Sequence, residues 1–267
     1  MALFTLQFAF SHFLTLLAFL SFFLVSSSSC YNPRKLQDAS NSDWSETIAT
    51  WYGSPDGAGS DGGACGYGNT VSQPPFSSLV SAGGQSLFDS GKGCGSCYEV
   101  KCTANSACSG KEVRVVITDE CPGCATSQFD LSGTAFGAMA ISGQENALRN
   151  VGKLNIQVEC NYPGISISFK VDSGSSQNYF AVMTEYEDGD GSLAKMELKD
   201  AQTSSSWLSM QQSWGATWKL DSPSNLQPPF SLRLTSAQSG QTVVADNVIP
   251  AGWQPGQTYR SVVNFNP

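Results

Sequence analysis

The cysteines of this chain crowd into one part of the sequence, and their distribution limits the fold more than any other feature. Nine cysteines occur in 267 residues, eight of them lie between Cys65 and Cys160, and residues 161–267 contain none. Disulfide bonds form and persist in proteins that follow a secretory route, so this grouping indicates one cross-linked domain. We therefore predict a first domain at residues 47–160, a linker at 161–164, and a second domain without disulfides at 165–267.

The N-terminus also indicates a secretory route. Residues 1–29 contain no Lys, Arg, Asp or Glu, and the apolar run Leu14–Val25 is followed by four serines and Cys30. This pattern is typical of a signal peptide, which we place at residues 1–30, before a polar leader at 31–46. An uncleaved membrane anchor is the alternative, because residues 3–25 could nearly span a bilayer. We expect cleavage, a secreted extracellular protein, and no stable membrane insertion after cleavage.

Short runs rich in β-branched and aromatic residues occur in both halves of the chain, separated by Gly, Asp and Pro. In the first half we predict one helix, Phe129–Ala140, with Asp130 or Ser132 near its start, and strands at residues 47–52, 98–102, 113–118 and 154–158. In the second half the predicted strands cover residues 165–171, 179–186, 193–198, 214–220, 231–235, 242–245 and 261–265. Their period-two alternation indicates an antiparallel β-sandwich, and the chain is predicted to be all-β.

The composition excludes several classes of function. The net charge is −8 and the pI is about 4.6, so the chain is a poor nucleic-acid binder. The single histidine, His12, lies in the predicted signal peptide, so the mature chain has no imidazole for a Ser–His or Cys–His nucleophile. Acid–base chemistry is then left mainly to Asp, Glu, Tyr and Lys.

Two C-x-x-C pairs, Cys94 with Cys97 and Cys121 with Cys124, allow three interpretations. Thiolates at this spacing fit tetrahedral zinc, or a redox-active dithiol. In a secreted chain with Cys102 and Cys108 nearby, structural disulfides are favoured over both. We expect neither a metal nor a cofactor.

Two carboxylates and a set of aromatic residues are candidates for chemistry on sugars. Asp119 follows a predicted strand and Asp130 begins the predicted helix. Glycosidic cleavage requires two carboxylates on opposite sides of a sugar, although Asp130 could simply cap the helix. Flat rings can stack on sugar rings or fill the sandwich core, and Trp214 and Trp218 on one strand would share a face. The aromatic candidates are Trp51, Tyr52, Tyr179, Trp207, Trp214, Trp218 and Trp253.

Several longer motifs resemble those of plant β-expansins, over nearly the whole mature chain and in the same order. They are Thr50–Gly53 (TWYG), Gly57–Gly59 (GAG), Gly62–Gly66 (GGACG), Gly93–Val100 (GCGSCYEV), Ile117–Asp119 (ITD), Phe129–Ala140 (FDLSGTAFGAMA), Ser213–Trp218 (SWGATW) and Val248–Pro250 (VIP). The resemblance implies a six-stranded double-psi β-barrel, similar to family-45 endoglucanases, followed by an immunoglobulin-like β-sandwich that binds polysaccharide. It also implies a protein that loosens plant cell walls by disrupting noncovalent contacts between polysaccharides such as cellulose, xylan or other matrix glucans, without hydrolysis. We expect a monomer whose partners are these polysaccharides.

The resemblance further assigns residues to sites. The polar residues of a groove would be Thr50, Tyr52, Asp61, Asp119 and Asp130. The polysaccharide-binding strip of aromatic residues would be Trp51, Tyr52, Tyr179 and Trp214. The disulfides would join Cys65 with Cys94, Cys97 with Cys160 and Cys102 with Cys108, leaving Cys121 and Cys124 to pair with each other. Asp130 matches the general acid of the endoglucanases. Their base would follow the TWYG motif, where this chain has no acid until Asp56.

Three hypotheses about activity follow. The first is nonhydrolytic wall loosening, because an inverting hydrolase without its base cannot activate water. The second is a weak inverting β-glucanase with Asp130 as acid and Asp56 or Asp61 as base, and the third is a purely carbohydrate-binding wall protein. The chain departs from the family pattern at Gln128, where histidine is usual, and at Leu154–Cys160, which is about three residues short.

Overall fold

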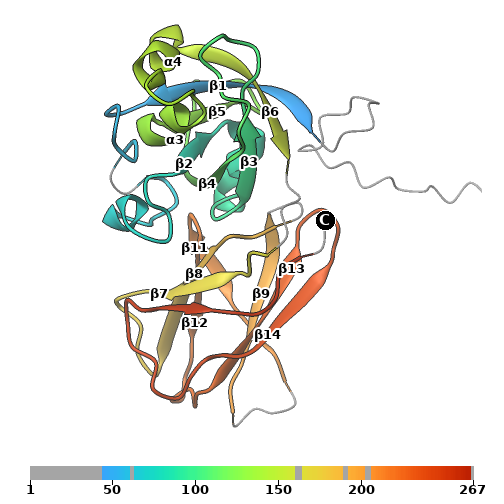
Figure 1. Ribbon diagram of the computed structural model, residues 1–267. Helices are drawn as coiled ribbons and strands as arrows, with labels where there is room; N and C mark the ends of the chain where they lie inside the picture. Colours follow the sequence, from blue (N-terminus) through green and yellow to red (C-terminus); the bar gives the residue numbers. More distant parts are fainter. Residues whose placement is uncertain (1–43, 61–62, 160–163, 189–191, 202–205, 266–267) are drawn as a thin grey trace, which may run out of the picture. The chain divides into compact units, whose positions relative to one another are not determined.

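The computed structural model describes residues 44–60, 63–159, 164–188, 192–201 and 206–265 (Figure 1). The predicted signal peptide at 1–30, most of the predicted leader at 31–46 and most of the predicted linker at 161–164 lie outside these ranges. Within them, no helix combines the length and the apolar character needed to cross a membrane. The barrel and the sandwich described below belong to one unit of the chain.

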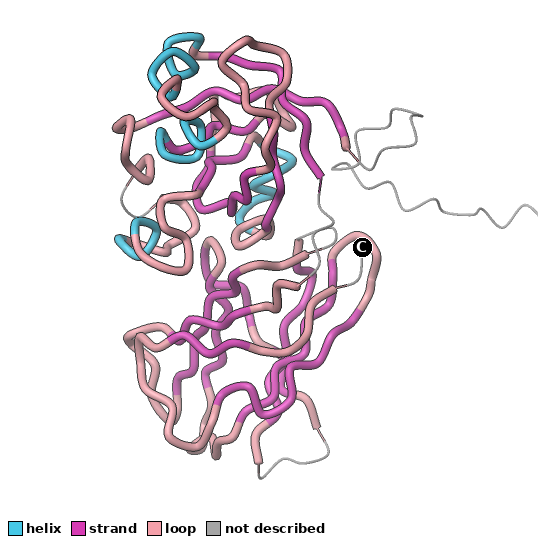
Figure 2. The backbone as a smooth tube through the Cα atoms, viewed as in Figure 1, coloured by secondary structure: helices cyan, strands magenta, loops and turns pink. Residues whose placement is uncertain are grey.

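Six strands in the first half of the chain close into a barrel in the order β1-β5-β2-β4-β3-β6 (Figures 1 and 2). They are β1 (Ser45–Tyr52), β2 (Val80–Gly83), β3 (Cys97–Lys101), β4 (Val113–Glu120), β5 (Phe129–Ser132) and β6 (Lys153–Glu159). Alternate residues face inward, and Ala49, Ile117 and Leu131 are fully buried there. The sequence analysis missed β2, because all four of its residues are buried and show no alternation.

The helices of the barrel domain are short, and they correct one prediction. They are α2 (Gln85–Phe88), α3 (Gly133–Ala138) and α4 (Glu145–Val151). The predicted helix over Phe129–Ala140 is wrong in its first four residues, which form β5 between β1 and β2. Pairing with two neighbouring strands overrides the helical spacing of the apolar residues. Ser132 is the N-cap, because its hydroxyl accepts a hydrogen bond from the Ala135 N–H at 3.0 Å, and Asp130 does not cap the helix.

Three disulfide bonds cross-link the described part of the barrel domain: Cys65–Cys94, Cys102–Cys108 and Cys121–Cys124. The pairing implied for Cys97 with Cys160 falls partly outside the described residues, because they do not include Cys160. Cys97 itself is buried at the start of β3. Each bridge closes a loop of the barrel, which limits the conformations of the unfolded chain.

The second half of the chain forms a sandwich of two sheets (Figure 1). One sheet has the order β10-β9-β13-β14 and the other β11-β12-β8-β7-β15. The strands are β7 (Ser168–Val171), β8 (Tyr179–Glu185), β9 (Leu193–Lys199), β10 (Leu208–Ser209), β11 (Gln211–Trp214), β12 (Thr217–Asp221), β13 (Phe230–Ser236), β14 (Thr242–Ile249) and β15 (Thr258–Arg260). Phe180 and Phe230 meet edge to face in the core, with ring centroids 5.1 Å apart, and Trp253 packs on both.

Two strand predictions in the sandwich are wrong. The segment Trp214–Leu220 is a hairpin and not one strand, because the chain turns at Gly215, whose φ of 51° lies in the left-handed region that favours glycine. The predicted strand over residues 261–265 is irregular. There the Ser261 hydroxyl accepts a hydrogen bond from the Val263 N–H at 3.2 Å, which competes with a strand ladder.

Candidate functional site

A chain of hydrogen bonds on the outside of the barrel ends at Asp130. The parallel pairing of β1 with β5 sets Thr50 opposite Asp130, and their neighbours Ala49, Phe129 and Leu131 point into the core. Thr50 Oγ1 donates to Asp130 Oδ1 at 2.6 Å, and Gln128 Nε2 donates to Thr50 Oγ1 at 3.0 Å. The Ala125 N–H donates to Gln128 Oε1 at 3.3 Å. Gln128 therefore orients the Thr50 hydroxyl toward the Asp130 carboxylate.

The surroundings of Asp130 favour its protonated form. Burial raises the pKa of Asp130 above the ordinary value, the Thr50 hydrogen bond lowers it, and the nearby Asp119 raises it again. A carboxyl group whose pKa is raised keeps its proton to higher pH, which is the property of a general acid. The same group can bind sugar hydroxyls as a donor when protonated and as an acceptor when ionised.

Asp119, at the end of β4, accepts three hydrogen bonds. Ser60 Oγ donates to Oδ2 at 2.6 Å, and the N–H groups of Ala64 and Glu120 donate to Oδ1 at 2.7 and 2.8 Å. These three donors fix the position of the carboxylate. The carboxylate of Asp119 therefore holds the loop that carries Ser60 and Ala64 against the barrel.

Tyr52 follows Thr50 by two residues on β1 and therefore points to the same outer face. Its ring packs on Gly59, where a Cβ atom would lie only 2.3 Å from Tyr52 Cζ. Burial raises the pKa of Tyr52 to about 12, with further contributions from the charges of Asp119 and Asp130. The phenol therefore stays protonated near neutral pH and serves as a hydrogen-bond donor beside the two carboxylates.

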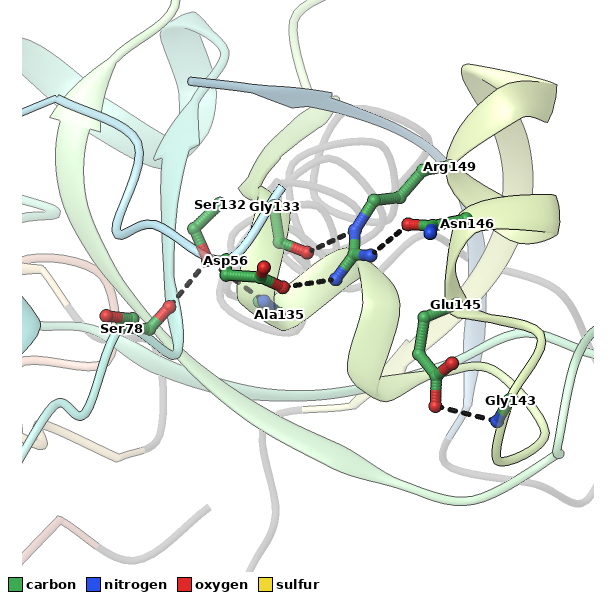
Figure 3. Close-up of polar contacts among 9 residues, drawn as sticks. All are labelled: Asp56, Ser78, Ser132, Gly133, Ala135, Gly143, Glu145, Asn146 and Arg149. Atoms are coloured by element: carbon green, nitrogen blue, oxygen red, sulfur yellow. Dashed lines mark hydrogen bonds and ion pairs between the residues drawn. The ribbon is translucent and has the colours of Figure 1, made fainter. Parts of the chain in front are cut away.

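The two residues proposed as a catalytic base fall in different places. Asp61 lies outside the described residues. The side chain of Asp56 is 94% exposed and forms an ion pair with Arg149 Nη2 at 3.6 Å (Figure 3). Arg149 also donates to the Gly133 carbonyl at 3.0 Å and to Asn146 Oδ1 at 2.9 Å, so Asp56 is drawn toward the two helices α3 and α4.

The aromatic residues of the barrel differ in exposure. Trp51 points away from Thr50 and Tyr52, donates from Nε1 to the Arg149 carbonyl at 2.9 Å, and packs on Phe136 with ring centroids 6.5 Å apart. It is half-buried against the barrel core. Tyr52 is thus the ring of this pair that lies on the same face as Asp130.

In the sandwich, Trp214 is the most exposed tryptophan of the described chain, at 56%. The strand pairings Trp214 with Thr217, Thr217 with Met183, and Asp221 with Tyr179 set Trp214 and Tyr179 on one outer face of the five-stranded sheet. The Trp214 ring covers Gly66, where a Cβ atom would lie 2.6 Å from Cη2. Trp214 therefore lies beside the barrel loop that includes Ala64, a donor to Asp119.

The other three candidate tryptophans have structural contacts. Trp218 is 6% exposed and Trp253 packs on Phe180, so both belong to the sandwich core. Trp207 is flanked by Lys199 Nζ at 5.0 Å and Arg233 Cζ at 4.5 Å from its ring centroid, which are cation–π distances. Trp214 and Trp218 do not share a face, because the turn at Gly215 reverses the chain between them.

Sequence reasoning missed the residues that donate hydrogen bonds to Asp119. Ser60 and Ala64 lie in a glycine-rich loop whose only signal was its irregularity, and their bonds to Asp119 join residues 59 and 55 positions apart. The sulfur atoms of Cys121 and Cys124 lie within 4.8 Å of an Asp130 carboxylate oxygen. These sulfurs form a disulfide, so they are not thiolate ligands for a metal.

Comparisons with known proteins match both halves of the chain to known domains. The model of the expansin C-terminal domain matches residues 167–250, and a double-psi β-barrel model described as lytic transglycolase matches residues 80–158. The chain is 60% identical over 261 residues to the putative expansin-B2 of Arabidopsis thaliana, covering 94% of this chain and 96% of that protein. It is 53% identical over 232 residues to expansin-B11 of Oryza sativa subsp. japonica, covering 84% and 78%.

Solved structures agree on the fold. The apo expansin of Clavibacter michiganensis aligns with a TM-score of 0.58 at 23% identity, covering 84% of this chain and 98% of that chain. A variant of the same bacterial protein in complex with cellohexaose aligns with a TM-score of 0.57 at 22% identity, with the same coverage. The predicted all-β fold, a double-psi β-barrel followed by a β-sandwich, is therefore confirmed.

Proposed function

Because this chain belongs to the expansin family, we propose that it is a secreted protein that loosens plant cell walls by disrupting noncovalent contacts between polysaccharides, without hydrolysing them. Its relatives by sequence are plant expansins that match over most of their own length. The relevant site is the groove that contains Thr50, Tyr52, Asp119 and Asp130.

One observation carries the nonhydrolytic part of the proposal: Asp119, the second carboxylate of the groove beside Asp130, already has three hydrogen-bond donors from the protein. An inverting glycosidase needs a second carboxylate that takes a proton from an attacking water. Asp119 instead accepts three hydrogen bonds, all from its own chain, which engage both of its carboxylate oxygens and hold it in place. The groove then retains an acid-like Asp130 and a donor in Tyr52, which suit the binding of sugar hydroxyls.

The aromatic residues supply the second part of such binding. Trp214 and Tyr179 share the outer face of one sheet, and Trp214 presents more than half of its surface to solvent. Exposed flat rings of this kind can stack on the C–H faces of sugars, and neighbouring exposed apolar side chains indicate a binding surface. A structurally similar bacterial expansin was solved in complex with cellohexaose, which supports a β-glucan chain as ligand.

A weak inverting β-glucanase is the second candidate, favoured by the raised pKa of Asp130. A purely carbohydrate-binding wall protein is the third, since binding to wall polysaccharide requires no loosening. Each of the three predicts a different combination of wall extension, sugar release and binding.

Extension of isolated grass and dicot cell walls under constant load separates the candidates, with reducing-end release measured on the same walls and Asp130→Asn as the variant. Nonhydrolytic loosening predicts extension with no sustained sugar release, and loss of extension in Asp130→Asn. Sustained release that Asp130→Asn abolishes would establish the glucanase instead. Binding without extension at acidic and neutral pH would leave only the carbohydrate-binding role.

We also propose the processing and organisation of the mature chain. Residues 1–30 are removed as a signal peptide, residues 47–160 and 165–267 form the two domains, and the mature protein is an extracellular monomer without a cofactor. Mass determination of the N-terminal peptide from the secreted protein tests the cleavage site. Size-exclusion chromatography with light scattering tests the monomer, and a dimer mass at micromolar concentration would contradict it.

A further inference from the structure

A pocket of about 470 Å³ lies on the barrel next to the groove. Its walls are residues 46–48 at the start of β1, the loop residues Ala125, Ser127 and Gln128, and Asn155 of β6. Gln128 belongs to both places, because it lines the pocket and its side-chain amide donates to Thr50, the partner of Asp130. The pocket and the groove are therefore adjoining parts of one surface.

The strand geometry gives the direction in which the pocket extends the groove. Successive residues of β1 alternate between the two faces, so Glu46 and Ile48 point to the same outer side as Thr50 and Tyr52. The β1–β6 register pairs Ile48 with Asn155, which places Asn155 on this side too. Ile48 lies two residues, about 7 Å, from Thr50 along the strand.

The wall formed by the loop is fixed before any ligand binds. Thr47 Oγ1 donates to the Ser127 carbonyl at 2.9 Å, and the Gly84 N–H donates to the Gln128 carbonyl at 2.9 Å. Gly84 approaches the loop so closely that a Cβ atom there would lie 2.1 Å from the Ala125 carbonyl oxygen. The disulfide Cys121–Cys124 closes the preceding turn. A preformed wall loses little conformational entropy on binding.

The chemistry of the walls fits a neutral sugar ring. Ile48 offers apolar surface to a C–H face, and the amides of Gln128 and Asn155 offer donors and acceptors to hydroxyl groups. Glu46 is the charged side chain in the lining, and its carboxylate accepts a hydrogen bond from Gln157 Nε2 at 3.0 Å. A negative charge at this position disfavours an acidic sugar.

We propose that this pocket is an additional subsite of the groove, which holds the next sugar of a neutral β-linked glycan whose neighbouring sugar lies at Thr50 and Asp130. The inference rests on the proposed function, because the occupant is the same glycan chain that the groove binds. It predicts that affinity increases with chain length up to the point where the subsite is filled, and that this increase depends on residues of the pocket.

Calorimetric titration of the full mature protein with cellotriose and cellohexaose, and with the corresponding xylo-oligosaccharides, tests the subsite. Wild-type protein should bind the hexasaccharide at least ~10-fold more tightly than the trisaccharide, as expected when several further contacts are made. Asn155→Ala should weaken hexasaccharide binding by about 3- to 10-fold, the effect of one lost hydrogen bond. Ala125→Leu, which adds bulk at the exposed rim, should remove most of the length effect. Both variants should weaken trisaccharide binding less than hexasaccharide binding, because the shorter ligand can also bind with all of its sugars outside the pocket.

Asn150→Ala is the matched control, because Asn150 is an exposed residue of α4 outside the pocket lining. Circular dichroism and thermal unfolding verify that each variant folds. Equal affinity of the wild type for tri- and hexasaccharide, or an unchanged length effect in both pocket variants, overturns the subsite and leaves the groove intact. If wild-type protein binds no oligosaccharide and no isolated wall, the proposed function fails, and the subsite fails with it.

Discussion

Glu185 is a buried acid in the sandwich, and its titration should make the stability of the protein depend on pH. The side chain lies on β8 and is 1% exposed, and Oε2 has no hydrogen-bond partner among the described residues. Burial raises the pKa of Glu185 to about 7, against the opposing charges of Lys170 and Arg260. Desolvation of the carboxylate thus outweighs its attraction to two cations.

The magnitude follows from the two pKa values. The ordinary value is 4.5 and the folded value is about 7, and one pKa unit corresponds to about 1.4 kcal/mol, so the difference is worth about 3 kcal/mol. Since the folded state holds the proton more tightly, stability from this group is fully present below pH 4.5. It is lost as the pH rises from 4.5 to 7, and above pH 7 the loss is complete. Glu185→Gln replaces the protonated acid by a neutral amide of similar shape and should remove this loss.

The assay is urea unfolding followed by tryptophan fluorescence at pH 4.5, 6 and 8, for wild type and for Glu185→Gln. We expect similar stability of the two proteins at pH 4.5, and a variant about 3 kcal/mol more stable than wild type at pH 8. Glu197→Gln is the control, because hydrogen bonding to Arg233 lowers the pKa of Glu197, so that its loss should destabilise the sandwich at pH 8 and have little effect at low pH. If the stability difference between Glu185→Gln and wild type were independent of pH, burial would not be the force that controls this carboxyl group.

Three further substitutions test the groove and the core. Gly59→Ala should displace the Tyr52 ring and abolish most wall extension. The control is Gly110→Ala, also at positive φ but in open space, which should lose only about 1 kcal/mol of stability and keep wall extension. Equal extension in both variants would contradict the role of Tyr52. Ser132→Ala removes the cap of α3 and should lower the free energy of unfolding by about 1 kcal/mol, and an unchanged urea midpoint would show that the cap is dispensable. Phe180→Ala should cost about 3–5 kcal/mol in the sandwich core by the same assay, and a loss below about 1 kcal/mol would show that the core collapses around the cavity.

The parts of the fold that could be predicted are those encoded locally. The strand at Thr47–Tyr52 was predicted within two residues, since its β-branched and aromatic residues are contiguous. The helix predicted over Phe129–Ala140 was wrong at its start because the deciding interactions come from β1, about 80 residues earlier. Periodicity within a segment carries no information about such distant strand partners.

Contacts between side chains that are distant in the sequence could not be predicted from local patterns either. The family motifs identify Thr50 and Asp130 as members of one site, but the hydrogen bond between them joins residues 80 positions apart. Likewise Trp214 and Trp218 were expected on one face, and a single turn at Gly215 makes one of them a surface ring and the other a core ring. Motifs therefore select candidate residues, and the path of the chain decides what each of them contacts.

Gln128 belongs to the hydrogen-bond chain that ends at Asp130, and it also lines the neighbouring pocket. A histidine, which the family resemblance leads us to expect at this position, would add a titratable group beside Asp130. The glutamine amide instead accepts from Ala125, donates to Thr50 and does not change charge with pH. In the Ala125–Gln128–Thr50–Asp130 chain the only ionisable group is then the carboxyl at its end. The pH response of this hydrogen-bond chain must therefore follow Asp130, because burial raises the pKa of its carboxyl group. A rise in pH turns the Asp130 carboxyl from a hydrogen-bond donor into an acceptor, while the bonds that orient it stay in place. Gln128 also lines the neighbouring pocket, so the charge of this part of the pocket wall does not change with pH.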